Sequence, residues 1–266
     1  ISPRLEGEEL PISVDGFRGG DRTTIALPEV RTEWMKKMKE AGLPVIFVMM
    51  PGSALGIEWE SQNIPAILNA WYGGQFAGQA IADVLFGDYN PSGKLPVTFY
   101  RSDSDLPPFG AFSMANRTYR YFKGEALYPF GFGLSYTMFD YSVPQVVSGG
   151  KVGEPIKVSV KVKNIGKKNG DEVVQLYLSH EGVEKAPITA LKGFKRVYLK
   201  AGEEKTLSFE ISPRDMSLPD DNGIITVFPG KKTIYAGGMS PTSEAKSKGL
   251  VKSSVCQITG DAYVIR

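Results

Sequence analysis

The spacing of apolar residues changes near the middle of the chain. Residues 27–42 carry apolar side chains at helical spacing up to a glycine, and residues 44–50 then form a continuous apolar run. The same succession returns as an apolar stretch at 66–71, a glycine-rich turn and a helical pattern at 78–87. Because helical segments alternate with fully apolar strands, we expect an open, mostly parallel sheet with flanking helices.

From about residue 139 to 240 the apolar pattern has a period of two. Five segments alternate apolar with polar residues, and turn-forming Asn, Gly and Asp residues separate them. Alternation of this kind over about 100 residues predicts an antiparallel β-sandwich. The expected strands are 156–162, 172–178, 191–199, 205–211 and 233–236.

These patterns divide the chain into four parts. Residues 1–125 form the α/β part, 126–138 a linker dense in proline, glycine and aromatic residues, and 139–240 the β-sandwich. The last segment, 241–266, is rich in Ser and Lys and is expected to be a tail that packs loosely or wraps.

Charge and composition narrow the classes of function. The 31 Lys and Arg residues nearly balance the 29 Asp and Glu residues, and no basic stripe argues for nucleic acid. No apolar run reaches the roughly 18 residues of a membrane span. No glycine-rich phosphate loop is present, so we expect no nucleotide cofactor. Cys256 is the only cysteine, which excludes an internal disulfide and a cysteine metal site.

A catalytic triad would have to use His180, the only histidine of the chain. It lies at the end of an expected strand, and no nucleophile motif is near it. We therefore expect His180 to be an ordinary strand-end residue. The absence of a Gly-x-Ser-x-Gly motif also argues against an α/β-hydrolase.

An acidic loop opens the chain and carries the candidate catalytic residues Glu6, Glu8 and Glu9. Carboxylates this close repel, which can raise the pKa of one of them and keep it protonated as a proton donor. A solvated acidic turn explains the same residues without chemistry. Since the chain begins at Ile1 rather than Met, we expect it to be the downstream part of a larger protein.

Aromatic residues on loops can stack on sugar rings or can hold two domains together. The run Asn-Arg-Thr-Tyr-Arg-Tyr-Phe at 116–122 alternates arginines with rings, and Arg117 and Tyr119 are its candidate substrate-binding residues. Both interpretations stay open for this run.

Several motifs together resemble the C-terminal half of family 3 glycoside hydrolases. They are Ala-Trp-Tyr-Gly-Gly-Gln at 70–75, Asp-Tyr-Asn-Pro-Ser-Gly-Lys-Leu-Pro at 88–96 and Tyr-Pro-Phe-Gly-Phe-Gly-Leu-Ser-Tyr at 128–136. The stretch 117–122 looks more like the β-xylosidase branch than the β-glucosidase branch. Met138 departs from the family pattern, because it separates a Thr from a Phe.

The resemblance implies a partial α/β sandwich domain followed by a fibronectin-III-like β-sandwich. It also implies a preceding barrel domain with an Asp nucleophile, and a Glu acid/base on the loop of the α/β domain. Family loops that read Gly-Glu-Gly or Glu-x-Glu both match Glu8, while Glu6 and Glu9 remain alternates because loop length varies. No metal or cofactor is implied.

The implied activity is that of a retaining, exo-acting β-xylosidase on xylo-oligosaccharides, with β-glucosidase as the alternative. The expected partners are the oligosaccharide, the barrel domain in the same or a separate chain, and a second copy in a homo-oligomer. The implied location is secreted or periplasmic. The competing hypothesis is a structural or carbohydrate-binding module that does no chemistry.

Overall fold

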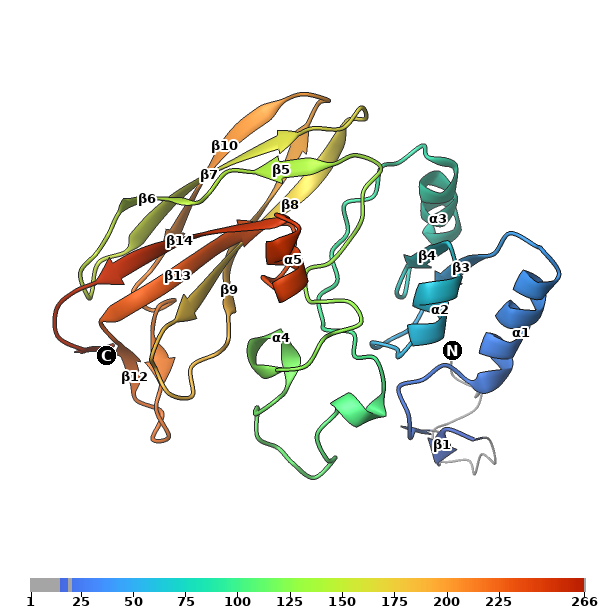
Figure 1. The fold of residues 1–266 in the computed structure, drawn as a ribbon, viewed down its shortest axis with the longest axis horizontal. Helices are drawn as coiled ribbons and strands as arrows, with labels where there is room; N and C mark the ends of the chain where they lie inside the picture. The colour runs from blue at the N-terminus through green and yellow to red at the C-terminus, as the bar shows by residue number, and fades with distance from the viewer. Residues whose placement is uncertain (1–14, 19–20, 266) are drawn as a thin grey trace. The chain divides into compact units, whose positions relative to one another are not determined.

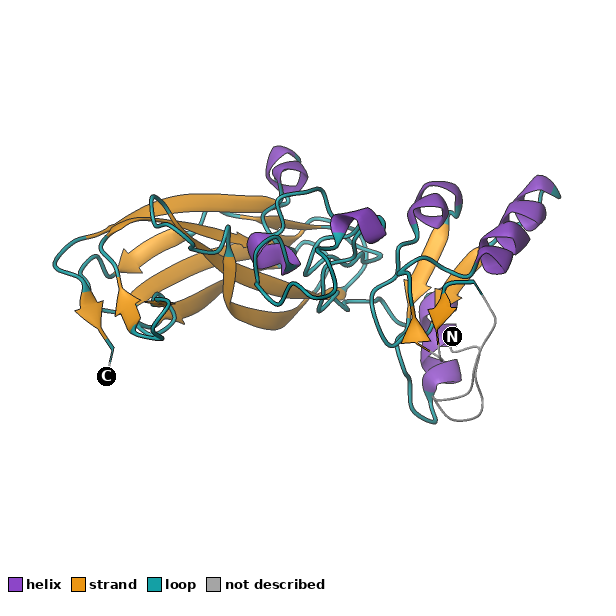
Figure 2. Cartoon of the chain, turned by 90° about the horizontal axis from the view of Figure 1, so that it is seen from below, coloured by secondary structure: helices purple, strands orange, loops and turns teal. Residues whose placement is uncertain are grey.

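Two compact units make up the described part of the chain. The computed structural model describes residues 15–18 and 21–265. The long strands belong to the second unit (Figures 1 and 2). The first unit takes residues up to 88, 98–116 and 123–128, and the second takes 89–97, 117–122 and 129 onward. The expected class, α/β followed by all-β, is confirmed. The exact domain boundaries stay a prediction.

The first unit is built on a short parallel pair of strands with helices between and after them. Strand β3 pairs in parallel with β4, with Ile46 opposite Ala66. Gly87 ends α3 in the left-handed conformation at φ 83°, as the glycine there predicted. Helix α2 was not expected, since six mostly polar residues carry no clear period. The elements are α1 (Glu29–Glu40), β3 (Ile46–Met49), α2 (Glu58–Asn63), β4 (Ala66–Asn69), α3 (Ala77–Phe86) and a 3₁₀ helix (Asp103–Asp105).

The apolar faces of this unit are more open than the sequence suggested. Strand β3 was expected to be buried on both faces, yet Ile46 is 54% exposed and only Met49 is buried within it. In the described residues β3 has β4 as its single neighbour, so one edge and much of each face stay uncovered. On α1 likewise Met35 is buried, while Val30 and Trp34 are exposed.

The second unit is an antiparallel β-sandwich. One sheet has the order β14-β13-β8-β9, the other β10-β7-β5 with β6 also on β7, and a small sheet joins β11, β12 and β15. All five expected strands are present as β7, β8, β9, β10 and β13. The strands are β5 (Phe139–Tyr141), β6 (Gln145–Ser148), β7 (Ile156–Asn164), β8 (Gly170–His180), β9 (Ala190–Leu199), β10 (Glu204–Ile211), β11 (Leu218–Pro219), β12 (Ile225–Val227), β13 (Gly230–Gly237), β14 (Val251–Ile258) and β15 (Tyr263–Val264).

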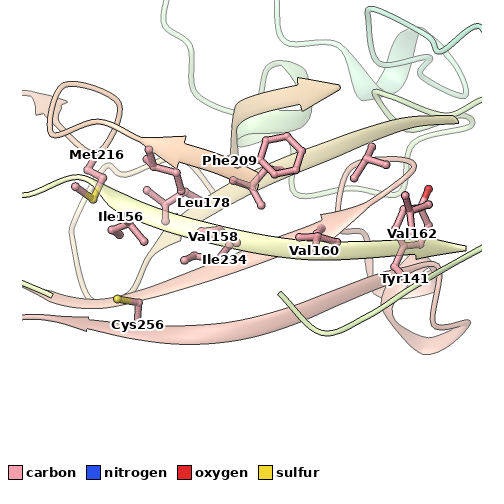
Figure 3. Packing of buried hydrophobic residues seen from close by; sticks show 14 of the residues in the cluster. Tyr141, Ile156, Val158, Val160, Val162, Leu178, Phe209, Met216, Ile234 and Cys256 are labelled. Carbon is pink, nitrogen blue, oxygen red and sulfur yellow. The ribbon is translucent and has the colours of Figure 1, made fainter. Parts of the chain in front are cut away.

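The core of the second unit lies between its two large sheets (Figure 3). Val158, Val160 and Val162 alternate along β7 and are almost completely buried. They belong to one apolar cluster with Leu178 of β8 and Ile234 of β13. The period of two therefore places every second side chain in the core, and the polar residues between them face outward.

The C-terminal segment corrects one prediction, because most of 241–266 is not a loosely packed tail. After α5 (Ser243–Ser247), strand β14 pairs with all eight residues of β13. Cys256 and Ile258 of β14 lie in the core (Figure 3 labels Cys256). Serines in the middle of β14 weaken the apolar alternation in the sequence, whereas the ladder and the buried side chains decide the structure.

Among the residues that the structure describes, no helix has the length and apolar character to cross a membrane.

Candidate active site

The acidic loop leads into a small hairpin. Glu6, Glu8 and Glu9 lie outside the described residues, so their acid/base role stays a prediction. Downstream, β1 (Phe17–Arg18) pairs antiparallel with β2 (Asp21–Arg22). Along the chain, the hairpin is therefore the first described element after the predicted proton donor.

Residues 22–26, which begin with the last residue of the hairpin, are held by hydrogen bonds. Arg22 donates from Nη2 to the carbonyl oxygen of Ala26 at 2.9 Å. Thr24 and Ile25 both donate to the carboxylate of Asp103, which lies far away in the sequence. No helix starts at Thr23, because α1 begins only at Glu29, after Pro28.

The loops after β3 and β4 meet at the carboxyl edge of the parallel pair, where ligands bind in open α/β sheets. A Cβ atom on Gly52 would lie 2.6 Å from the hydroxyl oxygen of Tyr72, so Tyr72 lies directly against the first loop. The rest of the Tyr72 side chain is open, and the residue is 80% exposed. The two loops are thus in contact.

Two features of this edge are not visible in the sequence. Both amide atoms of the Asn69 side chain are buried without a hydrogen-bond partner. Two residues later Trp71 has a φ of 52°, which is unusual for a bulky residue, and its ring packs edge-on against Phe99. Unpaired buried polar groups and backbone strain are costly, and both concentrate at functional sites.

Arg117 and Tyr119, the candidate substrate-binding residues, lie in the second unit around α4 (Thr118–Tyr121). The Tyr119 ring stacks on Phe130 with centroids 4.2 Å apart, and its hydroxyl accepts a hydrogen bond from the Leu191 amide. Both ends of Tyr119 therefore contact the protein, which favours a packing role. Arg117 is partly exposed beside Thr118, whose φ is 56°. Their substrate-binding role stays a prediction.

Several residues of the motif at 88–96 bind other segments of the second unit. The side-chain oxygen of Asn90 accepts from the Tyr136 amide at 2.7 Å, and its nitrogen donates to the Asn169 carbonyl at 2.9 Å. Lys94 forms an ion pair with buried Glu172 at 3.0 Å between Nζ and Oε1. These motif residues hold a loop on the sandwich, so their chemistry is structural.

His180 has the environment of a neutral structural histidine. It ends β8 opposite Lys232, and burial, aided by the charges of Lys232 and Lys192, lowers its pKa to about 3. Its Nδ1 is buried without a hydrogen-bond partner, so no carboxylate orients the ring from that side as a triad requires.

Two family models match the chain. The model of the glycosyl hydrolase family 3 C-terminal domain matches residues 2–136, and that of the fibronectin type III-like domain matches residues 172–240.

Characterised relatives and solved structures agree with these matches. The chain is 44% identical to a xylan 1,4-beta-xylosidase of Xylanibacter ruminicola, over 92% of this chain and 28% of the relative. It is 38% identical to a periplasmic beta-glucosidase of Salmonella typhimurium, over 81% of this chain and 30% of the relative. A beta-glucosidase structure from Kluyveromyces marxianus superposes with a TM-score of 0.79 at 30% identity, over 92% of this chain and 30% of that one. The chain spans about a third of the length of these proteins.

Proposed function

Since this chain belongs to glycosyl hydrolase family 3, we propose that it carries the acid/base of a retaining, exo-acting β-glycosidase. The observation that carries the proposal is the family match over residues 2–136, which includes the acidic loop. The favoured substrates are xylo-oligosaccharides, in keeping with the xylan 1,4-beta-xylosidase relative at 44% identity. A β-glucoside is the alternative substrate, because relatives of similar identity are named as beta-glucosidases.

The proposed chemistry needs two carboxyl groups about 5 Å apart. One carboxylate attacks the anomeric carbon and displaces the leaving group, while the second carboxyl protonates the departing oxygen. The second group then takes a proton from the incoming water, which releases the sugar with its configuration retained. Glu8 is the proposed second group, with Glu6 and Glu9 as alternates.

The proposed nucleophile comes from a barrel domain, joined to this chain or separate from it. The relatives are about three times longer than the matched region, which leaves room for such a domain. The open apolar side chains of the first unit, among them Trp34, Ile46 and Phe86, would suit a partner surface. Without that partner we expect the chain to self-associate. The proposed location is secreted or periplasmic; the Salmonella relative is named a periplasmic beta-glucosidase.

A hybrid enzyme tests the proposal directly. Residues 1–266 would replace the matched region of the Xylanibacter enzyme, and hydrolysis of p-nitrophenyl β-xyloside and β-glucoside would be measured. We expect activity in the hybrid and none in the isolated chain, with the preferred sugar read from kcat/KM.

Glutamine variants of the hybrid then identify the proton donor. Glu8→Gln should lower kcat/KM by a factor of about 10² or more for poor leaving groups. Activated leaving groups such as 2,4-dinitrophenolate need no proton and should lose much less. Glu6→Gln and Glu9→Gln test the two alternates on the same loop, and the variant that shows this dependence on the leaving group identifies the proton donor. Full activity in all three variants would refute the assignment.

A non-catalytic carbohydrate-binding module is the second candidate function. Phe109 and Phe112 on one loop of the first unit are 99% and 91% exposed, as rings that stack on sugars would be. An inactive, folded hybrid that still binds xylan, with binding lost in Phe109→Ala, would favour it.

A further inference from the structure

We infer that Asp103 is a positioning residue for the acid/base loop, an inference that rests on the proposed function. Asp103 does not carry the chemistry itself. Its carboxylate fixes residues 24–25, which follow the acidic loop in the chain, and a fixed attachment point constrains where the loop can place its proton donor.

Both oxygens of the Asp103 carboxylate hold this segment. Thr24 donates from Oγ1 to Oδ2 at 2.5 Å, and the amide of Ile25 donates to Oδ1 at 2.8 Å. The negative charge of Asp103 also attracts the guanidinium of Arg22. Burial lowers the pKa of Arg22, and this attraction opposes the lowering. Hydrogen bonds to a charged acceptor are stronger than neutral ones.

A second set of contacts, with Gly56, holds the same segment. The amide of Gly56 donates to the carbonyl oxygen of Ile25 at 2.8 Å, and Ala26 forms a parallel bridge with Gly56. A Cβ atom on Gly56 would lie 2.9 Å from the carbonyl oxygen of Arg101, too close for any other residue without a shift. Residues 22–26 are thus held by Gly56 as well as by Asp103.

Asp103 is itself placed by a rigid turn. It opens the 3₁₀ helix, whose first turn is closed by a capping box between Ser102 and Asp105. Arg101, just before it, pairs with Glu58 at 3.0 Å. The carboxylate therefore projects from a turn that is held at both ends.

The hairpin links the segment held by Asp103 to residues closer to the acidic loop in the chain. The amide of Thr23 donates to the carbonyl oxygen of Gly16 at 2.8 Å, and Phe17 lies opposite Arg22 in the ladder. A chain of contacts consequently runs from Asp103 back to Gly16. Because a displacement of about 1 Å in a reacting group can cost 10²-fold in rate, loosening this chain should slow the proton-transfer step.

The test uses Asp103→Ala and the milder Thr24→Val in the hybrid enzyme. We expect kcat/KM to fall on the order of tenfold to a hundredfold for β-xylosides with poor leaving groups, and far less for the dinitrophenyl xyloside. Thr24→Ser keeps the hydroxyl and should keep activity. Glu33→Ala removes a carboxylate that pairs with Lys36 on α1 of the same unit, and is the matched control.

Dependence on the leaving group separates positioning from a general loss of structure. Partial unfolding lowers the concentration of active enzyme, so it reduces the rates on both substrates equally. Equal losses, or no loss, in Asp103→Ala and Thr24→Val would overturn the inference. Folding of the first unit is checked by tryptophan fluorescence of the 266-residue chain carrying the same substitutions, since Trp34, Trp59 and Trp71, all the tryptophans of this chain, belong to that unit.

The two proposals fail in different ways. If one glutamine variant of the acidic loop shows the leaving-group dependence and Asp103→Ala does not, only the positioning role is wrong. If none of the three glutamates shows it, the proposed acid/base is wrong and the role of Asp103 falls with it.

Discussion

Removing one partner of the buried ion pair between Lys94 and Glu172 should destabilise the second unit strongly, and the loss is measurable. The two side chains are 14% and 6% exposed, and Nζ lies 3.0 Å from Oε1. Lys94 also donates to the carbonyl oxygen of Gly133 at 3.2 Å. The change Lys94→Met keeps much of the aliphatic stem and removes the charge and both contacts.

The magnitude follows from what is left behind. At 3.0 Å the attraction is about 5 kcal/mol for an effective dielectric constant near 20, and most of it offsets the cost of desolvating the two charges. Without its partner the Glu172 carboxylate stays buried with the Val173 amide, 2.7 Å away, as a remaining donor. We therefore expect the free energy of unfolding to fall by about 3–5 kcal/mol. Replacing both residues by Met should cost far less than the sum of the single changes.

Urea unfolding followed by far-UV circular dichroism reports both units, and the part of the transition that tryptophan fluorescence does not share belongs to the second unit. Tryptophan fluorescence follows the first unit in the same samples, because all three tryptophans lie there. Lys248→Met is the matched control: Lys248 pairs with Glu244 at 2.6 Å, but both side chains are more than half exposed, so little change is expected. A loss below about 1 kcal/mol for Lys94→Met, or additive single changes, would refute the reasoning.

Three further changes test other parts of the second unit. Because the pKa of His180 is about 3 in the fold and near 6.5 when unfolded, the unfolded chain binds the extra proton below pH 6.5. Protonation of His180 should then lower the free energy of unfolding by about 3 kcal/mol between pH 7 and 4. Urea unfolding at the two pH values should show that His180→Gln removes this decrease. Gly131→Ala should lower the free energy of unfolding by about 2 kcal/mol or more in the same assay, since φ is 79° and the new Cβ would collide with Gln175. The control Gly153→Ala, with φ 88° and open space around the Cβ, measures the backbone strain alone. Tyr119→Phe should cost about 1 kcal/mol of stability through the lost hydroxyl; a fall in kcat/KM of the hybrid enzyme would instead support substrate contact.

Periodic patterns predicted the long elements well. Residues 29–40 form a helix, and the alternating valines of β7 face the core, because a pattern repeated over several turns or pleats leaves one way to bury its apolar side. The parallel pairing of β3 with β4 was likewise expected from a helix-strand succession. Short or weakly patterned elements such as α2 and β14 were missed or misjudged, since neighbours rather than their own residues stabilise them.

The candidate site residues likewise fall into those that the sequence predicted and those that only the structure revealed. Sequence alone singled out Glu8, its alternates Glu6 and Glu9, and the candidate substrate-binding residues Arg117 and Tyr119. Residue type and motif carry that information. It could not single out Asp103, whose partners Thr24 and Ile25 are 79 and 78 positions away in the chain. Nor could it find the unpaired amide of Asn69 or the left-handed backbone of Trp71.

The amino-acid sequence by itself determined the order of an α/β part and a β-sandwich, the family and the acidic loop, all of which depend on local pattern. Only the tertiary structure decided that Lys94 is bound to Glu172, that β14 completes a sheet and that residues 22–26 are held by Asp103. These are contacts between distant segments. Their energy comes from burial and from charges brought close together, which exist only after the chain has folded.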